Sequence, residues 1–151
     1  MKVYSLIKQQ RVPRSLSEVF AFFEDPTNLD RLTPADLDFQ ILTPQPIAMQ
    51  PGTLIDYTIK ILGVRVRWRT LVTAYEPPSK FVDEQLRGPY DFWHHTHSFT
   101  ANGNGTLIED RVCYALPLGL LGRLAHALFV RRQLEAIFAY RAEIIAELFG
   151  K

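Results

Sequence analysis

Two histidines near the middle of the chain have the residue type and spacing that proton transfer or metal binding uses. His95 and His97 are separated by one residue, so both project from the same face of an extended strand. Trp93 and Phe99 fall on that face as well, which indicates that it is turned toward the protein interior. We therefore predict two buried imidazoles, whereas His94 should face solvent.

A predicted hairpin brings a first aspartate to these histidines. Residues 102–105 read Asn-Gly-Asn-Gly, a strong signal for a tight turn between antiparallel strands. If the chain turns at residues 103–104, the ladder sets Asp110 opposite His97. The same register also sets the apolar residues of the two strands opposite each other, which supports the pairing of Asp110 with His97.

A second turn, at residues 88–90, brings another aspartate to the same face. Provided that this turn holds an odd number of residues, Asp83 lies opposite His95 and Gln85 lies opposite Trp93. Buried carboxylates without partners would cost several kcal/mol each, so pairing with imidazole is the physical expectation. We predict two His–Asp pairs in the interior, with Gln85 nearby.

Three interpretations of these pairs remain open. The first is a satisfied network that fixes strand register and offers hydrogen bonds to the polar end of a ligand. The second is general acid–base catalysis beside a carbonyl, with His95, His97, Asp83 and Asp110 as candidate catalytic residues. The third is a metal site, because His-x-His on a strand is a known ligand spacing that either aspartate could complete. We favour the first and expect no metal or other cofactor.

The elements that position these residues follow from the period of the apolar residues. Ser15 opens a first helix as its N-cap, with Glu18 in the capping-box position, and a second short helix follows at 27–32. The apolar spacing over 120–149 predicts a helix about 45 Å long, with a possible bend at 130–132. Alternation with a period of two predicts strands at 3–12, 38–41, 54–61, 64–75, 80–87, 91–99 and 106–114.

This order of elements predicts an α+β helix-grip fold. A curved antiparallel sheet of six to seven strands surrounds a long C-terminal helix, with two short helices after the first strand, in a single domain over 1–151. A helix lying on a strongly bent sheet leaves a cavity between the two. Its predicted apolar lining is Ile55, Tyr57, Trp68, Phe81, Trp93, Phe99, Ile108 and Tyr114, and its predicted polar lining is Asp83, Gln85, His95, His97 and Asp110.

The composition excludes several classes of partner. With 17 Lys and Arg against 16 Asp and Glu, the net charge of +1 does not favour nucleic acid. Cys113 is the single cysteine, so no internal disulfide forms. The first residues lack the pattern of a signal peptide, and no run approaches the roughly 20 apolar residues of a membrane span. We expect a soluble cytoplasmic protein without stable membrane insertion; the sequence does not define its oligomeric state.

The segment 116–129 is unusually apolar for a connection followed by the start of a helix. Packing into the core is the default interpretation, and an entrance gate that touches a membrane is the alternative. His126, within this segment, is expected on the surface of the helix.

Several short stretches are typical of one known family. They are FVDEQ at 81–85, GPY at 88–90, WHHTHSF at 93–99, GTL at 105–107, GLLGRL at 119–124 and FAYR at 138–141. In these stretches the chain resembles the SRPBCC superfamily, which includes START-like lipid-binding domains, polyketide cyclases and dehydratases, and a bacterial branch of unknown function. The resemblance covers nearly the whole chain and implies the helix-grip fold.

These observations predict a protein that binds or carries a small hydrophobic ligand, such as a lipid, a polyketide-like molecule or an aromatic compound. The resemblance implies an alternative from another class, a cyclase- or dehydratase-like enzyme that uses the His–Asp pairs as general acid and base. A third possibility is a protein-interaction module, as in chaperone-activating relatives of the fold.

Overall fold

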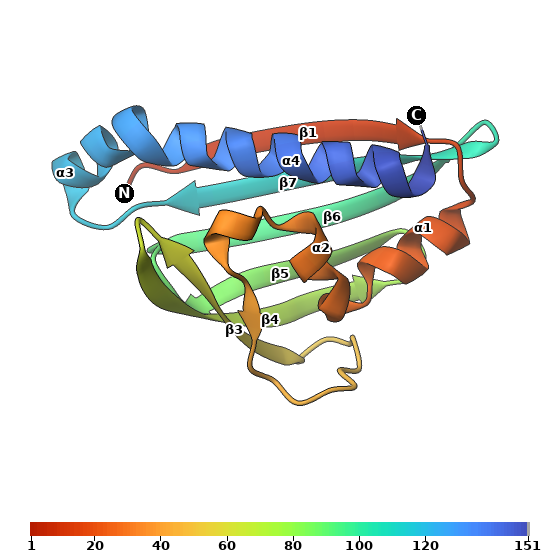
Figure 1. Cartoon of the computed structure of the whole chain (residues 1–151), viewed down its shortest axis with the longest axis horizontal. Helices are drawn as coiled ribbons and strands as arrows, with labels where there is room; N and C mark the ends of the chain where they lie inside the picture. Colours follow the sequence, from red (N-terminus) through yellow and green to blue (C-terminus); the bar gives the residue numbers. More distant parts are fainter. Residues whose placement is uncertain (151) are drawn as a thin grey trace.

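The computed structural model of the protein describes residues 1–150 and is built on one seven-stranded antiparallel sheet (Figure 1). The strands follow the order β1-β7-β6-β5-β4-β3-β2, so the chain is a meander closed at one edge by its first strand. Their bounds are β1 (Tyr4–Val12), β2 (Gln40–Ile41), β3 (Leu54–Ile61), β4 (Val64–Glu76), β5 (Lys80–Arg87), β6 (Phe92–Asn102) and β7 (Gly105–Ala115). The predicted helix-grip architecture is confirmed.

The strand register agrees with the prediction in the part of the sheet that carries the histidines. Asp110 lies opposite His97 across β6 and β7, and Asp83 lies opposite His95 across β5 and β6. The described β5–β6 ladder ends at Glu84, so it does not extend to the predicted pairing of Gln85 with Trp93.

Short helices cover one end of the sheet after β1. They are α1 (Leu16–Phe23), the 3₁₀ turn η1 (Pro26–Asn28), α2 (Leu29–Leu32) and the 3₁₀ turn η2 (Ala35–Leu37). Ser15 caps α1 as predicted, because its hydroxyl accepts a hydrogen bond of 3.3 Å from the backbone N–H of Glu18. The second predicted helix is one turn of α-helix preceded by the 3₁₀ turn η1, which begins at Pro26.

The C-terminal helix runs along the sheet, as predicted, but it is not a uniform α-helix (Figure 1). It consists of α3 (Gly119–Ala125), the π-helical segment η3 (His126–Val130) and α4 (Arg131–Phe149). The irregularity predicted at 130–132 therefore lies a few residues earlier and is a π-helical turn.

Two clusters of buried apolar side chains fill the space between the sheet and the helices. Along β7, Asp110 separates Ile108 of the larger cluster from Val112 of the smaller one, so a polar layer divides the core. The larger cluster contains Val12, Val19, Phe20, Phe23, Leu32, Phe81, Phe99, Ile108, Ile145 and Phe149. The smaller one contains Val112, Tyr114, Leu134 and Phe138.

None of the helices within residues 1–150 combines the length and apolar character needed to cross a membrane. The cytoplasmic location stays a prediction from the sequence.

Candidate functional site

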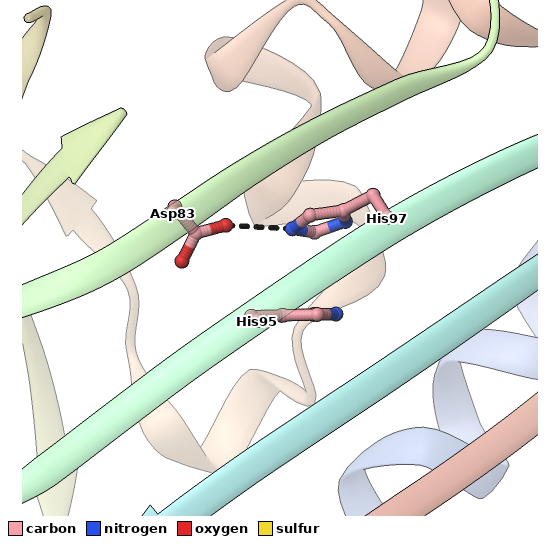
Figure 2. Close-up of side chains that lie close together, drawn as sticks. All are labelled: Asp83, His95 and His97. Carbon is pink, nitrogen blue, oxygen red and sulfur yellow. Dashed lines mark hydrogen bonds and ion pairs between the residues drawn. The ribbon is translucent and has the colours of Figure 1, made fainter. Parts of the chain in front are cut away.

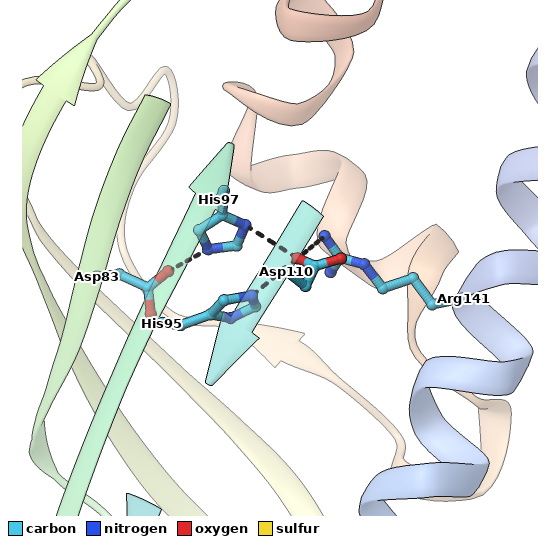
Figure 3. Close-up of polar contacts among 5 residues, drawn as sticks. All are labelled: Asp83, His95, His97, Asp110 and Arg141. Atoms are coloured by element: carbon cyan, nitrogen blue, oxygen red, sulfur yellow. Dashed lines mark hydrogen bonds and ion pairs between the residues drawn. The ribbon is translucent and has the colours of Figure 1, made fainter. Parts of the chain in front are cut away.

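A buried polar cluster lies where three strands and the long helix meet (Figures 2 and 3). β5 supplies Asp83, β6 supplies His95 and His97, β7 supplies Asp110, and α4 supplies Arg141. The side chains of His95, His97, Asp110 and Arg141 are less than 10% exposed, and Asp83 is partly buried. Two His–Asp pairs are present, as expected, but the partners are exchanged relative to the prediction: His95 bonds Asp110 and His97 bonds Asp83.

The hydrogen bonds of these pairs run diagonally across the strands. His95 Nε2 lies 2.8 Å from Asp110 Oδ1, and His97 Nε2 lies 2.6 Å from Asp83 Oδ2. Each histidine thus bonds the aspartate two positions along the neighbouring strand from the residue it faces, a separation that long side chains can span. The two imidazoles stack on each other with ring centroids 3.7 Å apart.

Arg141 is a member of the cluster that the sequence analysis did not identify. Its Nη2 lies 3.4 Å from Asp110 Oδ1, and its guanidinium lies over the rings of Phe23 and Phe138, 5.3 and 5.8 Å from their centroids. The signal was present, because Arg141 follows Phe138 by three residues and precedes Ile145 by four, on the apolar face of the helix.

Both carboxyl groups are held in the ionised form. Burial alone would raise the pKa of Asp110, but the Arg141 guanidinium and the hydrogen bond from His95 hold it well below its usual range. Burial likewise opposes ionisation of Asp83, but the hydrogen bond from His97 together with the nearby His95 and Arg141 outweighs it, so the pKa of Asp83 is also lowered. Two carboxylates therefore face one guanidinium inside the protein.

Burial and the neighbouring His95 lower the pKa of His97 to about 4, although Asp83 and Asp110 act in the opposite direction. His97 is consequently a neutral imidazole at neutral pH. Because Asp83 is an ionised acceptor, the Nε2 of His97 carries the proton and donates it to the carboxylate. The Nδ1 of His97 then carries a lone pair; it is buried, lacks a hydrogen-bond partner and lies 3.6 Å from Asp110 Oδ1.

The same reasoning assigns the orientation of His95. Asp110 is an ionised acceptor, so the hydrogen bond of 2.8 Å is donated by His95 Nε2. Among residues 1–150, no side chain or backbone group is hydrogen-bonded to His95 Nδ1. In the neutral imidazole this nitrogen carries a lone pair, on a side chain that lines a cavity.

This cavity, of about 200 Å³, lies beside the cluster. Eight of the predicted lining residues form its wall: Ile55, Tyr57, Trp68, Phe81, Asp83, Trp93, His95 and His97. Further wall residues come from the short helices and from α4, where sequence patterns alone do not show which side chains reach the sheet. They include Phe22, Phe23 and Leu32 from the short helices and Leu134, Ile137, Phe138 and Arg141 from α4, and two more, Phe39 and Tyr90, come from connecting segments.

The structure does not place five other predicted residues on the cavity wall. Phe99 and Ile108 are in the larger apolar cluster, and Asp110 lies between the histidines and Arg141. Gln85 exchanges two hydrogen bonds with the backbone of Tyr90, of 2.7 and 3.0 Å, and so holds the β5–β6 turn. The fifth residue, Tyr114, contacts His126 instead.

The prediction that His126 is a surface residue is wrong. His126 is buried; its Nε2 lies 2.7 Å from the hydroxyl of Tyr114, and its ring stacks on Tyr4 with centroids 3.5 Å apart. His126 follows the buried Gly122 by four residues, so both lie on the side of the helix that faces the sheet.

The side chains of Asp83, His95 and His97 each offer an atom that could bind a metal, and these atoms lie within 4.8 Å of one another (Figure 2). Two features disfavour that use. The imidazole planes are only 22° from parallel, so the in-plane lone pairs of the rings do not converge on one point. Both Nε2 atoms are also engaged by carboxylates.

An antiparallel sheet wrapped around a C-terminal helix, with a cavity between them, defines a helix-grip protein. No protein-family model and no curated protein matches the sequence. Solved structures do match. The di-domain ARO/CYC StfQ from the steffimycin biosynthetic pathway has a TM-score of 0.73 and 16% identity, over 98% of this chain and 50% of that chain.

Two further structures match this chain over most of their own length. The protein TTHA0849 of Thermus thermophilus has a TM-score of 0.72 and 15% identity, over 96% of this chain and 99% of its own. Norcoclaurine synthase from Thalictrum flavum has a TM-score of 0.64 and 12% identity, over 97% of this chain and 88% of its own. The chain therefore has the same fold as these structures, which is the helix-grip fold that the resemblance to the SRPBCC superfamily implied; the bacterial branch stays a prediction.

We expect the protein to lose stability as the pH falls from about 6.5 to about 4. In the unfolded chain His97 takes up a proton near pH 6.5, whereas in the folded protein its pKa is about 4. The unfolded state binds more protons over this interval, so the free energy of unfolding decreases with falling pH, by up to about 3 kcal/mol. Urea unfolding at a series of pH values measures this slope.

His97→Gln should remove most of the slope, and His94→Gln should retain it. His126 contributes with the same sign, because burial, Arg131 and Lys2 lower its pKa, so a His126→Gln variant is measured in parallel. An unchanged slope in His97→Gln would contradict the assignment of a neutral, buried imidazole.

Arg141→Met should destabilise the protein by about 3–5 kcal/mol, because it leaves the Asp110 carboxylate buried without its guanidinium. The double variant Asp110→Asn/Arg141→Met removes both charges and should be more stable than Arg141→Met alone. A double-mutant cycle based on urea unfolding measures this coupling. Additive losses would show that the two side chains do not interact.

Proposed function

We propose that the protein binds a small, mainly apolar molecule, of the size of one or two aromatic rings, in the cavity beside the polar cluster. The observation that carries the proposal is an apolar cavity of about 200 Å³ with Asp83, His95 and His97 in one wall. An apolar cavity of roughly 150 Å³ is large enough to hold benzene, so this volume suits a compact molecule better than a long acyl chain.

The aromatic residues of the cavity wall favour an aromatic ligand. Tyr57 stacks on Trp68 with centroids 5.8 Å apart, and Trp93 meets Trp68 edge to face at 5.2 Å. Aromatic faces and edges of this kind stabilise a bound ring by more than the burial of its area alone.

The ligand should also carry a hydrogen-bond acceptor. The Nε1–H of Trp68 and the Nε–H of Arg141 belong to side chains of the cavity wall, and both donors are buried without a partner among residues 1–150. An unpaired buried donor costs about 1–3 kcal/mol. A ligand oxygen that reaches one of them would remove part of this cost, which is how a few polar groups orient a ligand in an apolar site.

Ile137→Trp should weaken ligand binding by about tenfold or more, because the larger side chain projects from α4 into the cavity. The neutral two-ring ketone 6-propionyl-2-(dimethylamino)naphthalene, titrated by fluorescence, gives the affinity. Leu42→Trp is the matched control, since Leu42 is half-exposed and does not line the cavity. Equal affinity in Ile137→Trp and the original protein would place the probe outside the cavity and remove the support for this proposal.

Native mass spectrometry of the protein from its own host, followed by denaturing extraction, tests for a resident ligand. A released compound of one or two rings would support the proposal. A long-chain lipid would contradict the size argument.

A second candidate is an enzyme that removes a proton next to a carbonyl, and the arrangement of His95 favours it. The ionised Asp110 accepts from His95 Nε2, so the other nitrogen of the imidazole can accept a proton while Asp110 stabilises the resulting imidazolium. Two solved structures of the same fold carry the names of an ARO/CYC and a synthase. A shared fold is compatible with catalysis but does not establish it.

His95→Gln should abolish any such activity. Exchange of the methyl protons of 2-acetonaphthone in D₂O, followed by NMR, reports proton removal next to a carbonyl. We expect the protein to accelerate this exchange and His95→Gln to lower the rate by about 100-fold or more, the usual share of a general base. His94→Gln is the control; no acceleration by the original protein would exclude this candidate for simple ketones.

A further inference from the structure

One end of the molecule exposes nearly all of its most accessible apolar side chains. In residues 1–150, the large apolar side chains that are more than half exposed have exposed fractions of 55% to 85%. They are Met1, Leu62, Val64, Leu86, Leu118, Leu120, Leu121, Leu124 and Leu128, which we call the apolar end.

The strand register brings these residues together. The start of β1 pairs with the end of β7, and the end of β7 pairs with the start of β6. Because the sheet is antiparallel throughout, the end of β5 and the β3–β4 turn lie at the same end. α3 and the N-terminus are found there too (Figure 1).

The helical part of the apolar end has an amphipathic arrangement. Leu120, Leu124 and Leu128 are spaced by four residues, so they form a ridge along the outer side of α3 and η3. Their exposure is costly in water, and clusters of exposed apolar side chains mark sites of contact with another apolar phase.

The charges beside this ridge are positive. Residues 116–134 contain Arg123, Arg131 and Arg132 and no Asp or Glu. Within residues 1–150, no carboxylate lies within 4.0 Å of these arginines or of Lys2, which lines a shallow hollow together with Arg123. Two acidic residues are near: Asp91, which lines the same hollow, and Glu135, which is paired with Lys8 at 2.6 Å.

We propose that the apolar end docks on the surface of an anionic lipid bilayer, with α3 lying in the plane of the interface. Leucines that project between unpaired arginines match the surface of such a bilayer, because the leucines can enter its apolar interior while the arginines contact its negatively charged head groups. A second protein with a plain apolar surface would leave the arginines unmatched. This docking does not depend on the proposed function, since it uses none of the side chains of the polar cluster.

The apolar end also adjoins the cavity. Ile61 and Gln133 line the cavity wall and are sequence neighbours of the exposed Leu62 and Arg132. A docked protein would thus hold this part of the cavity wall close to the lipid, where apolar molecules concentrate.

Flotation with vesicles tests the proposal. The original protein should bind vesicles of phosphatidylcholine with about 30 mol% phosphatidylserine at least about tenfold better than vesicles of phosphatidylcholine alone. Binding should fall at about 1 M salt, where the Debye length is about 3 Å. Leu120→Gln/Leu124→Gln and Arg123→Gln/Arg131→Gln/Arg132→Gln should each reduce binding by about tenfold or more.

Leu42→Gln/Leu54→Gln is the matched control, because these leucines are partly exposed and lie outside the apolar end. It should bind vesicles as the original protein does, and circular dichroism confirms that each variant is folded. Absence of binding to the anionic vesicles overturns the proposal. So does a shift from dimer to monomer in Leu120→Gln/Leu124→Gln together with no vesicle binding, since the apolar end would then be an interface between two copies of the chain.

Discussion

The buried ion pair between Asp110 and Arg141 is the interaction on which the rest of the interior depends. It joins β7 to α4 and keeps Asp110 ionised despite its burial. The ionised carboxylate fixes which nitrogen of His95 carries the proton, and the stacked rings connect His95 to His97 and through it to Asp83. One chain of contacts therefore crosses from the helix through three strands. Such a network adds little net stability, but it strongly disfavours any other position of the helix, because that would leave charges unpaired.

This polar layer also explains why the core is divided and why a cavity remains. Apolar side chains pack closely on both sides of Asp110, in two clusters that do not merge. Side chains that could fill the space next to the histidines would have to desolvate Asp83 further. The large aromatic rings of β3 and β4, Tyr57 and Trp68, instead pack against each other. The cavity is lined both by these aromatic rings and by the histidines of the polar layer.

The sequence was sufficient to predict the strands, their register and the pairing of two histidines with two aspartates, because a period of two and a strong hairpin signal define which residues face one another. It did not predict that the hydrogen bonds are diagonal, since that depends on rotamers. It also missed Arg141, which lies on a helical face treated as wholly apolar, and the burial of His126, which depends on how the helix packs against Tyr4 of β1 and Tyr114 of β7. Contacts between a helix and a sheet are set by tertiary packing, which local periodicity does not contain.

The π-helical segment separates two helical faces that a continuous α-helix would couple. A residue added within such a turn rotates the helix before it by about 100° relative to the helix after it, since an α-helix has about 3.6 residues per turn. The leucines of α3 and Arg141 of α4 therefore belong to one helix, but the π-helical segment between them changes which side of the helix axis each set of side chains faces. Loss of a single residue from His126–Val130 would turn the leucine ridge to another side and leave α4 seated on the sheet. The same change would displace the buried His126 from Tyr114 and Tyr4, so the outer surface of this helix is coupled to the interior at this residue.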